Sequence, residues 1–171
     1  MAISNYQLGP CKVEFPEGTD LGKTQGGVTV TVEETFAALN TDQDGESPVD
    51  EYVTGTQVTV EGNLAEITLD NVAKLYKQEV VGTGDSRKVE ISTNVGTSLL
   101  SESDVMIIKP YDGGTVSGTA NDWITLHHAA LKATGSLSFN ATDQRVLAFS
   151  ATGYPDSATG LIATFGDTAA S

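Results

Sequence analysis

The sequence is poor in cations, with 9 Lys and Arg against 23 Asp and Glu and a formal net charge of −14. Binding to a nucleic-acid backbone requires Lys and Arg that replace counterions, so this balance argues against a protein that wraps DNA or RNA. The charge suits a soluble surface, a cation partner or a wall that repels other polyanions. Aromatic side chains are also scarce, at 6%, beside 18 glycines. This composition is typical of a strand-rich protein with a lean core and many turns.

Cysteine and long apolar runs are nearly absent as well. The single cysteine, Cys11, excludes an intrachain disulfide and a cysteine metal cluster. No apolar run approaches the length of a membrane span, so we expect no membrane partner. The first ten residues, MAISNYQLGP, lack the basic start and apolar stretch of a signal peptide. We therefore expect a single domain over residues 1–171 that folds in a reducing cytoplasm.

Two segments, 28–33 and 57–64, alternate between apolar and polar side chains and are predicted to be strands. The apolar set is expected to face the core and comprises Val28, Val30, Val32, Val58, Val60 and Leu64. The polar set is expected to share the opposite face and comprises Thr29, Thr31, Glu33, Gln57, Thr59 and Glu61. The acidic connection between the two strands, residues 37–55, is predicted to be a long loop.

One helix is predicted from Thr68, which can cap the start, and it is expected to end by Gly82 and Gly84. Its apolar stripe would comprise Leu69, Val72, Ala73 and Tyr76. Further strands are predicted over 12–15, 88–92, 105–111, 123–130 with a continuation over 131–139, 145–151 and 161–165. The fold class expected is mainly β, an antiparallel β-sandwich or barrel flanked by one α-helix.

The stretch Gly22-Lys23-Thr24 has the residues that end a phosphate-binding P-loop. A P-loop needs a glycine five positions before the Gly-Lys pair, where this chain has Glu17. It must also open a helix whose amides hold the phosphates, whereas Gly26 and Gly27 lead into a strand of valines and threonines. We therefore interpret the segment as a turn.

The acidic connection matches a calcium loop in its spacing. Asn40, Asp42, Asp44, Gly45 and Glu51 follow the D-x-[DN]-x-[DN]-G-x5-E pattern with asparagine in first place. Such a loop normally lies between two helices, while both flanks here alternate as strands. A solvated acidic loop is therefore the preferred interpretation, and these four oxygen-bearing residues remain a weak calcium candidate.

No catalytic constellation emerges from the sequence. His127 and His128 are adjacent on a predicted strand, so they point to opposite faces and cannot hold one metal together. Cys11 has no His, Asn or acidic partner nearby in sequence and is expected to be a small core residue. We expect a protein that is not an enzyme and has no cofactor.

The order LGPCKVEF, LGKTQGGVTVTVEE and DEYVTGTQVTVEGNLAEITLDNVAKL resembles the major tail tube proteins of long-tailed, siphovirus-like phages. The features concerned are Leu8-Gly9-Pro10, the Leu21-Gly22 turn before a Gly-Gly-Val strand, Pro48-Val49-Asp50, Thr54-Gly55 and the AEITLDNVAKL strand-to-helix junction. The likeness covers roughly residues 6 to 80. The C-terminal half shares only the general character of strands and glycine-rich turns.

The resemblance implies a structural virion protein that forms stacked homo-hexameric rings, in which inner sheets of adjacent subunits join into a barrel around a lumen. An N-terminal arm, residues 1–10, and an assembly loop, residues 37–55, would contact other subunits. The assembly interface would comprise Asp42, Asp44, Glu46, Pro48, Asp50 and Glu51. The polar strand face described above would line the lumen. The expected partners are tape-measure and tail-terminator or tail-tip proteins, with DNA passing transiently. The expected location is the virion tail, assembled in the host cytoplasm.

A rival interpretation is a calcium-dependent β-sandwich that binds a surface or a carbohydrate. It relies on the calcium-like spacing of residues 40–51 and on Trp123 and Tyr111, aromatic side chains that could stack on a sugar.

Overall fold

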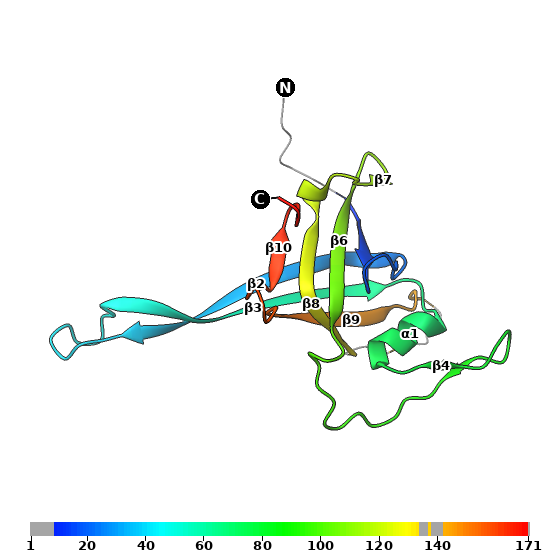
Figure 1. Ribbon diagram of the computed structural model, residues 1–171, viewed down its shortest axis with the longest axis horizontal. Helices are drawn as coiled ribbons and strands as arrows, with labels where there is room; N and C mark the ends of the chain where they lie inside the picture. The colour runs from blue at the N-terminus through cyan, green and yellow to red at the C-terminus, as the bar shows by residue number, and fades with distance from the viewer. Residues whose placement is uncertain (1–8, 134–136, 138–141, 171) are drawn as a thin grey trace.

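The computed structural model describes residues 9–133, 137 and 142–170, and a single antiparallel sheet dominates it. The strand order is β1-β6-β8-β9-β3-β2 (Figure 1). These strands are β1 (Cys11–Glu14), β2 (Thr24–Leu39), β3 (Asp50–Leu64), β6 (Asp104–Asp112), β8 (Ile124–Ala133) and β9 (Leu147–Tyr154). β7 (Thr115–Val116) pairs with β6, and β10 (Ala163–Phe165) pairs with β8. The predicted fold class, mainly antiparallel β with one flanking helix, is confirmed.

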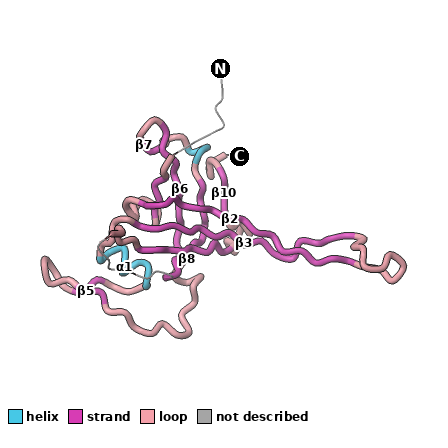
Figure 2. Tube along the Cα trace, turned by 180° about the vertical axis from the view of Figure 1, so that it is seen from behind, coloured by secondary structure: helices cyan, strands magenta, loops and turns pink. Residues whose placement is uncertain are grey.

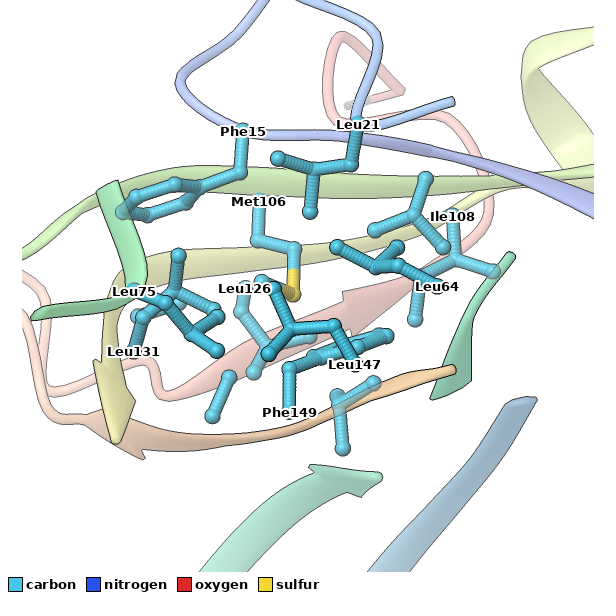
Figure 3. Packing of buried hydrophobic residues seen from close by; sticks show 14 of the residues in the cluster. Phe15, Leu21, Leu64, Leu75, Met106, Ile108, Leu126, Leu131, Leu147 and Phe149 are labelled. Atoms are coloured by element: carbon cyan, nitrogen blue, oxygen red, sulfur yellow. The ribbon is translucent and has the colours of Figure 1, made fainter. Parts of the chain in front are cut away.

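The sheet curls around one apolar core (Figure 3). The backbone N–H of Leu21, just before β2, donates to the carbonyl of Val13 on β1 at 2.9 Å and brings the two ends of the sheet together. The buried cluster comprises Val13, Phe15, Leu21, Val58, Val60, Leu64, Leu75, Met106, Ile108, Leu126, Ala129, Leu131, Leu147, Phe149 and Ala151. Gly62 lies against this core because a Cβ there would stand 2.9 Å from the Phe149 ring.

The β2–β3 register confirms the predicted separation of polar and apolar faces. Thr29 lies opposite Glu61, Thr31 opposite Thr59 and Glu33 opposite Gln57, so all six polar residues share one face. On the other face, five of the six predicted core residues are buried or pack against the core: Val28, Val30, Val58, Val60 and Leu64. The sixth prediction is wrong, because Val32 is 48% exposed where the hairpin leaves the core.

About half of the predicted loop over residues 37–55 is strand, which corrects the sequence-based expectation. β2 continues to Leu39 and β3 begins at Asp50, so only residues 40–49 form the connecting turn. Val49 N–H donates to the Leu39 carbonyl at 2.8 Å and closes the hairpin. The polar composition concealed these strand ends, because a β-ladder is held by backbone hydrogen bonds that any side chain permits.

The predicted helix is α1 (Leu69–Tyr76), and its cap is confirmed, since Asn71 N–H donates to Thr68 Oγ1 at 3.1 Å. Its buried face differs from the prediction, because Leu75 enters the core while Leu69 is exposed. The Asn71 amide donates to the Leu21 carbonyl at 2.8 Å and thereby fixes the rotation of the helix. The helix also ends earlier than predicted, at Tyr76, and is followed by Lys77, whose left-handed backbone has a φ of 54°.

The remaining strands lie close to the positions predicted from the sequence, but their first and last residues differ. The strand predicted over 88–92 is reduced to β5 (Lys88–Val89), which pairs with β4 (Val80–Val81). A short 3-10 turn, η1 (Ala120–Asp122), precedes β8. The continuation predicted over 131–139 reaches Ala133, and residues 134–136 and 138–139 lie outside the described residues. So do residues 1–8 of the predicted N-terminal arm. Within the described residues, no helix has the length and apolar character needed to cross a membrane.

The buried carboxylate of Glu14 links β1 to the neighbouring strand β6. Glu14 on β1 is 5% exposed and accepts hydrogen bonds at 2.9 Å from both Lys12 and Lys109. Burial raises the pKa of the Glu14 carboxyl, but the hydrogen bonds from Lys109 and Lys12 outweigh it and hold the pKa below its ordinary value. The Lys109 ammonium also lies 4.2 Å from the centroid of the Trp123 ring. This network stabilises the β1 edge.

Replacing Glu14 by glutamine should lower the free energy of unfolding at neutral pH by about 1–3 kcal/mol, because Lys109 loses its counter-charge and Lys12 keeps only Asp20, at 3.7 Å. Since the folded-state pKa is lowered, the stabilisation is complete above the ordinary glutamate pKa of about 4.3 and is lost as the pH falls through the folded-state value. Urea denaturation of both proteins should therefore converge in acid. Glu17→Gln, at an exposed position, is the matched control. Equal stabilities at neutral pH would contradict this role.

Candidate assembly surfaces

The β2–β3 hairpin extends well beyond the rest of the sheet. β3 pairs with β9 only from Val58 to Leu64, so residues 34–56 form a two-stranded hairpin that no other described strand borders on either side. We call these residues the hairpin arm. They project away from the body in both views (Figures 1 and 2). An isolated two-stranded hairpin is at best marginally stable in water, so the hairpin arm lacks the support that a sheet normally provides.

Large apolar side chains lie on both faces of the hairpin arm. Phe36 pairs with Val53, and the next pair, Ala37 with Tyr52, points to the opposite face. Phe36, Tyr52 and Val53 are 56%, 58% and 57% exposed, and Leu39 is exposed as well. Apolar side chains gathered on one exposed element mark an interaction surface. A β-bulge between Thr35 and Phe36 separates this apolar part from the base of the hairpin arm.

The tip of the hairpin arm is acidic. Residues 34–56 hold six carboxylates and no Lys or Arg: Glu34, Asp42, Asp44, Glu46, Asp50 and Glu51. All six residues of the predicted assembly interface, Asp42 to Glu51, are exposed at or next to the turn. The hairpin arm therefore combines apolar faces with charge of a single sign.

The structure does not assemble the calcium loop that the spacing suggested. Glu51 lies on β3 opposite Ala38, which holds it in an extended strand and not in a loop that bends around a cation. Asp44 accepts a hydrogen bond from Thr41 Oγ1 within the turn. No group of three or more His, Cys, Asp or Glu side chains among the described residues is placed to hold a metal ion.

The polar face of β2 and β3 continues onto the neighbouring strand. Glu61 lies opposite Ser150 and Thr59 opposite Thr152 on β9. Thr29, Glu33, Gln57 and Glu61 are exposed, and Thr31 and Thr59 are half-buried. The predicted lumen-lining set is thus one contiguous hydrophilic surface, with its carboxylates at Glu33 and Glu61.

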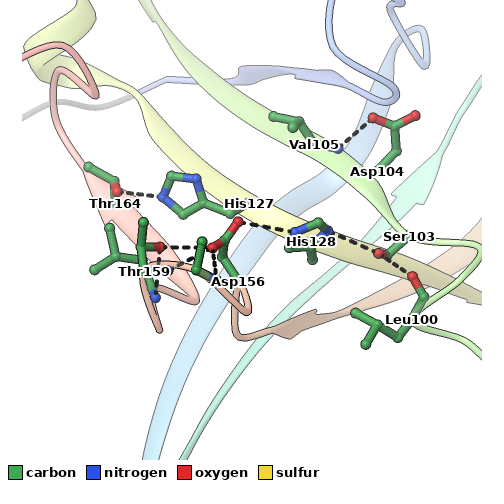
Figure 4. A network of polar contacts seen from close by, with 11 residues as sticks. Leu100, Ser103, Asp104, Val105, His127, His128, Asp156, Thr159 and Thr164 are labelled. Carbon is green, nitrogen blue, oxygen red and sulfur yellow. Dashed lines mark hydrogen bonds and ion pairs between the residues drawn. The ribbon is translucent and has the colours of Figure 1, made fainter.

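Sequence reasoning missed one polar cluster, Ser103, His128 and Asp156 (Figure 4). His128 Nδ1 lies 3.3 Å from Ser103 Oγ, and His128 Nε2 lies 3.4 Å from an Asp156 carboxylate oxygen. Catalytic triads place the serine on Nε2 and the aspartate on Nδ1, which is the reverse arrangement. The Ser103 hydroxyl donates to the Leu100 carbonyl at 2.6 Å, so its proton points away from the imidazole.

Asp156 also stabilises the turn in which it lies, through hydrogen bonds to the backbone. Its carboxylate accepts backbone hydrogen bonds from Thr159 and Ala158, which together with His128 hold the pKa of Asp156 below its ordinary value. The cluster therefore ties the β9–β10 connection to β8. The other histidine, His127, contacts Thr164 on β10 through Nε2 at 2.8 Å, so the two histidines have separate partners, as their adjacency predicted.

The remaining candidate side chains have structural partners. Cys11 is half-buried, and burial raises the pKa of its thiol, which disfavours the nucleophilic thiolate. Trp123 donates from Nε1 to the Ser117 carbonyl at 2.9 Å, and one face of its ring lies under Lys109. Tyr111 pairs with Val116 in the β6–β7 hairpin. One face of the Trp123 ring is thus covered by Lys109.

Serine substitutions at Val53 and Val60 should separate assembly from folding, because both valines lie on β3 but only Val60 is buried. Val53→Ser should leave the unfolding free energy of the monomer within about 0.5 kcal/mol of wild type. It should also reduce association in sedimentation velocity runs at high concentration. Val60→Ser should cost more than about 2 kcal/mol because it removes core contacts and buries a hydroxyl. A Val53→Ser variant that unfolds as easily as Val60→Ser would contradict the exposed position of the hairpin arm.

Comparison with known proteins adds no assignment to these surfaces. No protein-family model matches the chain, and no curated protein matches it either. The functional argument consequently depends on the residues and geometry described above.

Proposed function

We propose that this chain is a non-enzymatic structural subunit, the major tail tube protein of a long-tailed phage. In this proposal it assembles into stacked hexameric rings that form a conduit for DNA. The observation that carries the proposal is the hairpin arm, which exposes apolar side chains on both faces and has no described strand paired to either of its outer edges. Such an element is stabilised when another chain covers it.

The sheet edge supports the same proposal. Among the described strands, β2 is the last of the sheet and pairs only with β3, so the outer edge of this sixteen-residue strand is free of a described partner. Long exposed edges invite pairing with another chain. Edge-to-edge pairing of identical subunits around a ring satisfies those backbone groups and leaves no free edge.

The polar face of β2 and β3 then becomes the wall of the conduit. Threonine and glutamine side chains keep it wetted, and Glu33 and Glu61 repel the phosphates of passing DNA. The net charge of −14 fits a channel through which a polyanion slides without binding.

The remaining parts of the proposal concern partners and location. The tube encloses a tape-measure protein during assembly and is capped by tail-terminator or tail-tip proteins. Assembly takes place in the host cytoplasm and the product is part of the virion tail. These assignments rest on the sequence resemblance, which covers roughly residues 6 to 80.

Removal of the hairpin arm tests the proposal directly. Replacing residues 34–56 by an Asn-Gly turn joins Glu33 to Gln57, which lie directly opposite each other. The variant keeps the β3–β9 pairing and every buried core residue, so it should fold as a monomer. Wild-type protein at high concentration should form rings or tubes with an open lumen in negative-stain microscopy, and the variant should form neither. Normal tubes from a variant with a native circular dichroism spectrum would refute the proposal.

Charge reversal on the polar face tests its place in the lumen. Tubes of the double variant Glu33→Lys with Glu61→Lys should retain short duplex DNA at low salt and release it as salt rises, because lysines displace phosphate counterions. Wild-type tubes should retain none. The matched control, Glu17→Lys with Asp85→Lys, changes the net charge equally at two exposed positions away from this face. Equal DNA retention by both double variants would place the polar face outside the lumen.

A further inference from the structure

The hairpin arm has one residue more on β3 than on β2. Thr35 lies opposite Gly55, and the next residue of β2, Phe36, lies opposite Val53. Thr54 therefore lies between two consecutive pairs and has no partner on β2, which makes it the extra residue of a β-bulge. The bulge shifts the register of every pair between it and the turn.

The bulge decides which side chains of the hairpin arm share a face. In a regular ladder, Phe36 would lie opposite Thr54, and Val53 would lie opposite Ala37. Val53 would then join the face that carries Glu33, and Phe36 would lose its apolar neighbour. With the bulge, Phe36 and Val53 lie opposite each other on the face away from the polar set. The shift of one residue thus pairs two exposed apolar side chains.

The core of the domain does not select the bulged register. None of the described residues 34–56 is buried, and register is weakly specified in a strand pair that has no buried face. A regular ladder would pair Leu39 with Glu51 in place of Asp50, so it would lengthen the connecting turn by one residue only. The bulged register therefore depends on local contacts.

Two threonines and a glycine make contacts at the bulge. Thr54 Oγ1 donates to the Thr35 carbonyl at 3.1 Å and lies 3.1 Å from Thr35 Oγ1. Thr35 Oγ1 donates in turn to the Gly55 carbonyl at 3.4 Å. A Cβ at residue 55 would stand 3.1 Å from Thr35 Oγ1, which is closer than an ordinary contact, so glycine leaves room for the two hydroxyls. These three residues link the strands at the point where the register changes.

We propose that Thr54 is a positioning residue, which with Thr35 and Gly55 selects the bulged register and so places Phe36 and Val53 on one face of the hairpin arm. The consequence for assembly rests on the proposed function, in which these apolar side chains become covered. A slip to the regular ladder would divide the two side chains between opposite faces and bring Val53 onto the polar face.

Nuclear Overhauser contacts in dilute protein test the register without assembly. Wild-type protein should show contacts between Phe36 and Val53. Thr54→Val keeps the shape of the side chain but removes its hydroxyl, so the intensity of Ala37–Val53 contacts relative to Phe36–Val53 contacts should rise about fivefold, the effect of one lost hydrogen bond. Thr54→Ser should keep the wild-type contacts. The matched control is Thr56→Val, at an exposed position on the same strand. Wild-type contacts in Thr54→Val, or an equal change in Thr56→Val, would overturn the role of Thr54.

Deletion of Thr54 separates the register from the hydroxyl. Without this residue a regular ladder pairs Phe36 with Val53 again, so the deletion variant should keep the wild-type contacts although it lacks the bulge. In sedimentation assays, Thr54→Val should raise the threshold concentration for assembly, and the deletion should return it toward that of wild type. A deletion variant that keeps the Phe36–Val53 contact yet assembles no better than Thr54→Val would overturn the proposal, because the shared face would then have no effect.

The two proposals fail in different ways. Wild-type contacts in dilute Thr54→Val would remove the positioning role and leave the tube subunit untouched. Wild-type protein that stays monomeric at every concentration would remove the proposed function, while the contacts in dilute protein would still decide whether Thr54 selects the register.

Discussion

The pairing of β2 with β3 is the interaction on which the rest of this structure depends. At its base, Val30 lies opposite Val60, and this pair closes the core between the curled sheet and α1. Farther along, the same ladder of backbone hydrogen bonds continues past the last contact with β9 and builds the hairpin arm. One hairpin therefore stabilises the domain at one end and presents an uncovered surface at the other.

This division explains how a lean core and a large exposed apolar surface coexist in one small chain. The valines at the base of the hairpin are used within the domain, and Phe36, Tyr52 and Val53 are left uncovered. The six carboxylates of the hairpin arm give it charge of one sign, so two arms repel each other at their tips.

The alternation of valine and threonine predicted both strands, their faces and the polar surface, because a strand with one buried face must repeat every two residues. It could not predict the strands' length. Residues 37–39 and 50–55 form a ladder that no core supports, so their side chains follow no one-sided pattern. The helix stripe was wrong at Leu69 because Asn71, a polar residue bonded to Leu21, sets the rotation of α1. The Ser103, His128 and Asp156 cluster joins three distant segments, and only tertiary structure brings them together.

Hydrogen exchange of the wild-type protein at low and high concentration tests the central claim most directly. In dilute protein, amides of residues 34–39 and 50–56 should exchange rapidly, because the hairpin arm has free edges and no covering layer. At concentrations where the protein assembles, these amides should become protected, while protection of the core strands β6, β8 and β9 changes little. Rapid exchange of the hairpin arm in the assembled protein would contradict the account, because the contacts that hold the subunits together would then lie elsewhere.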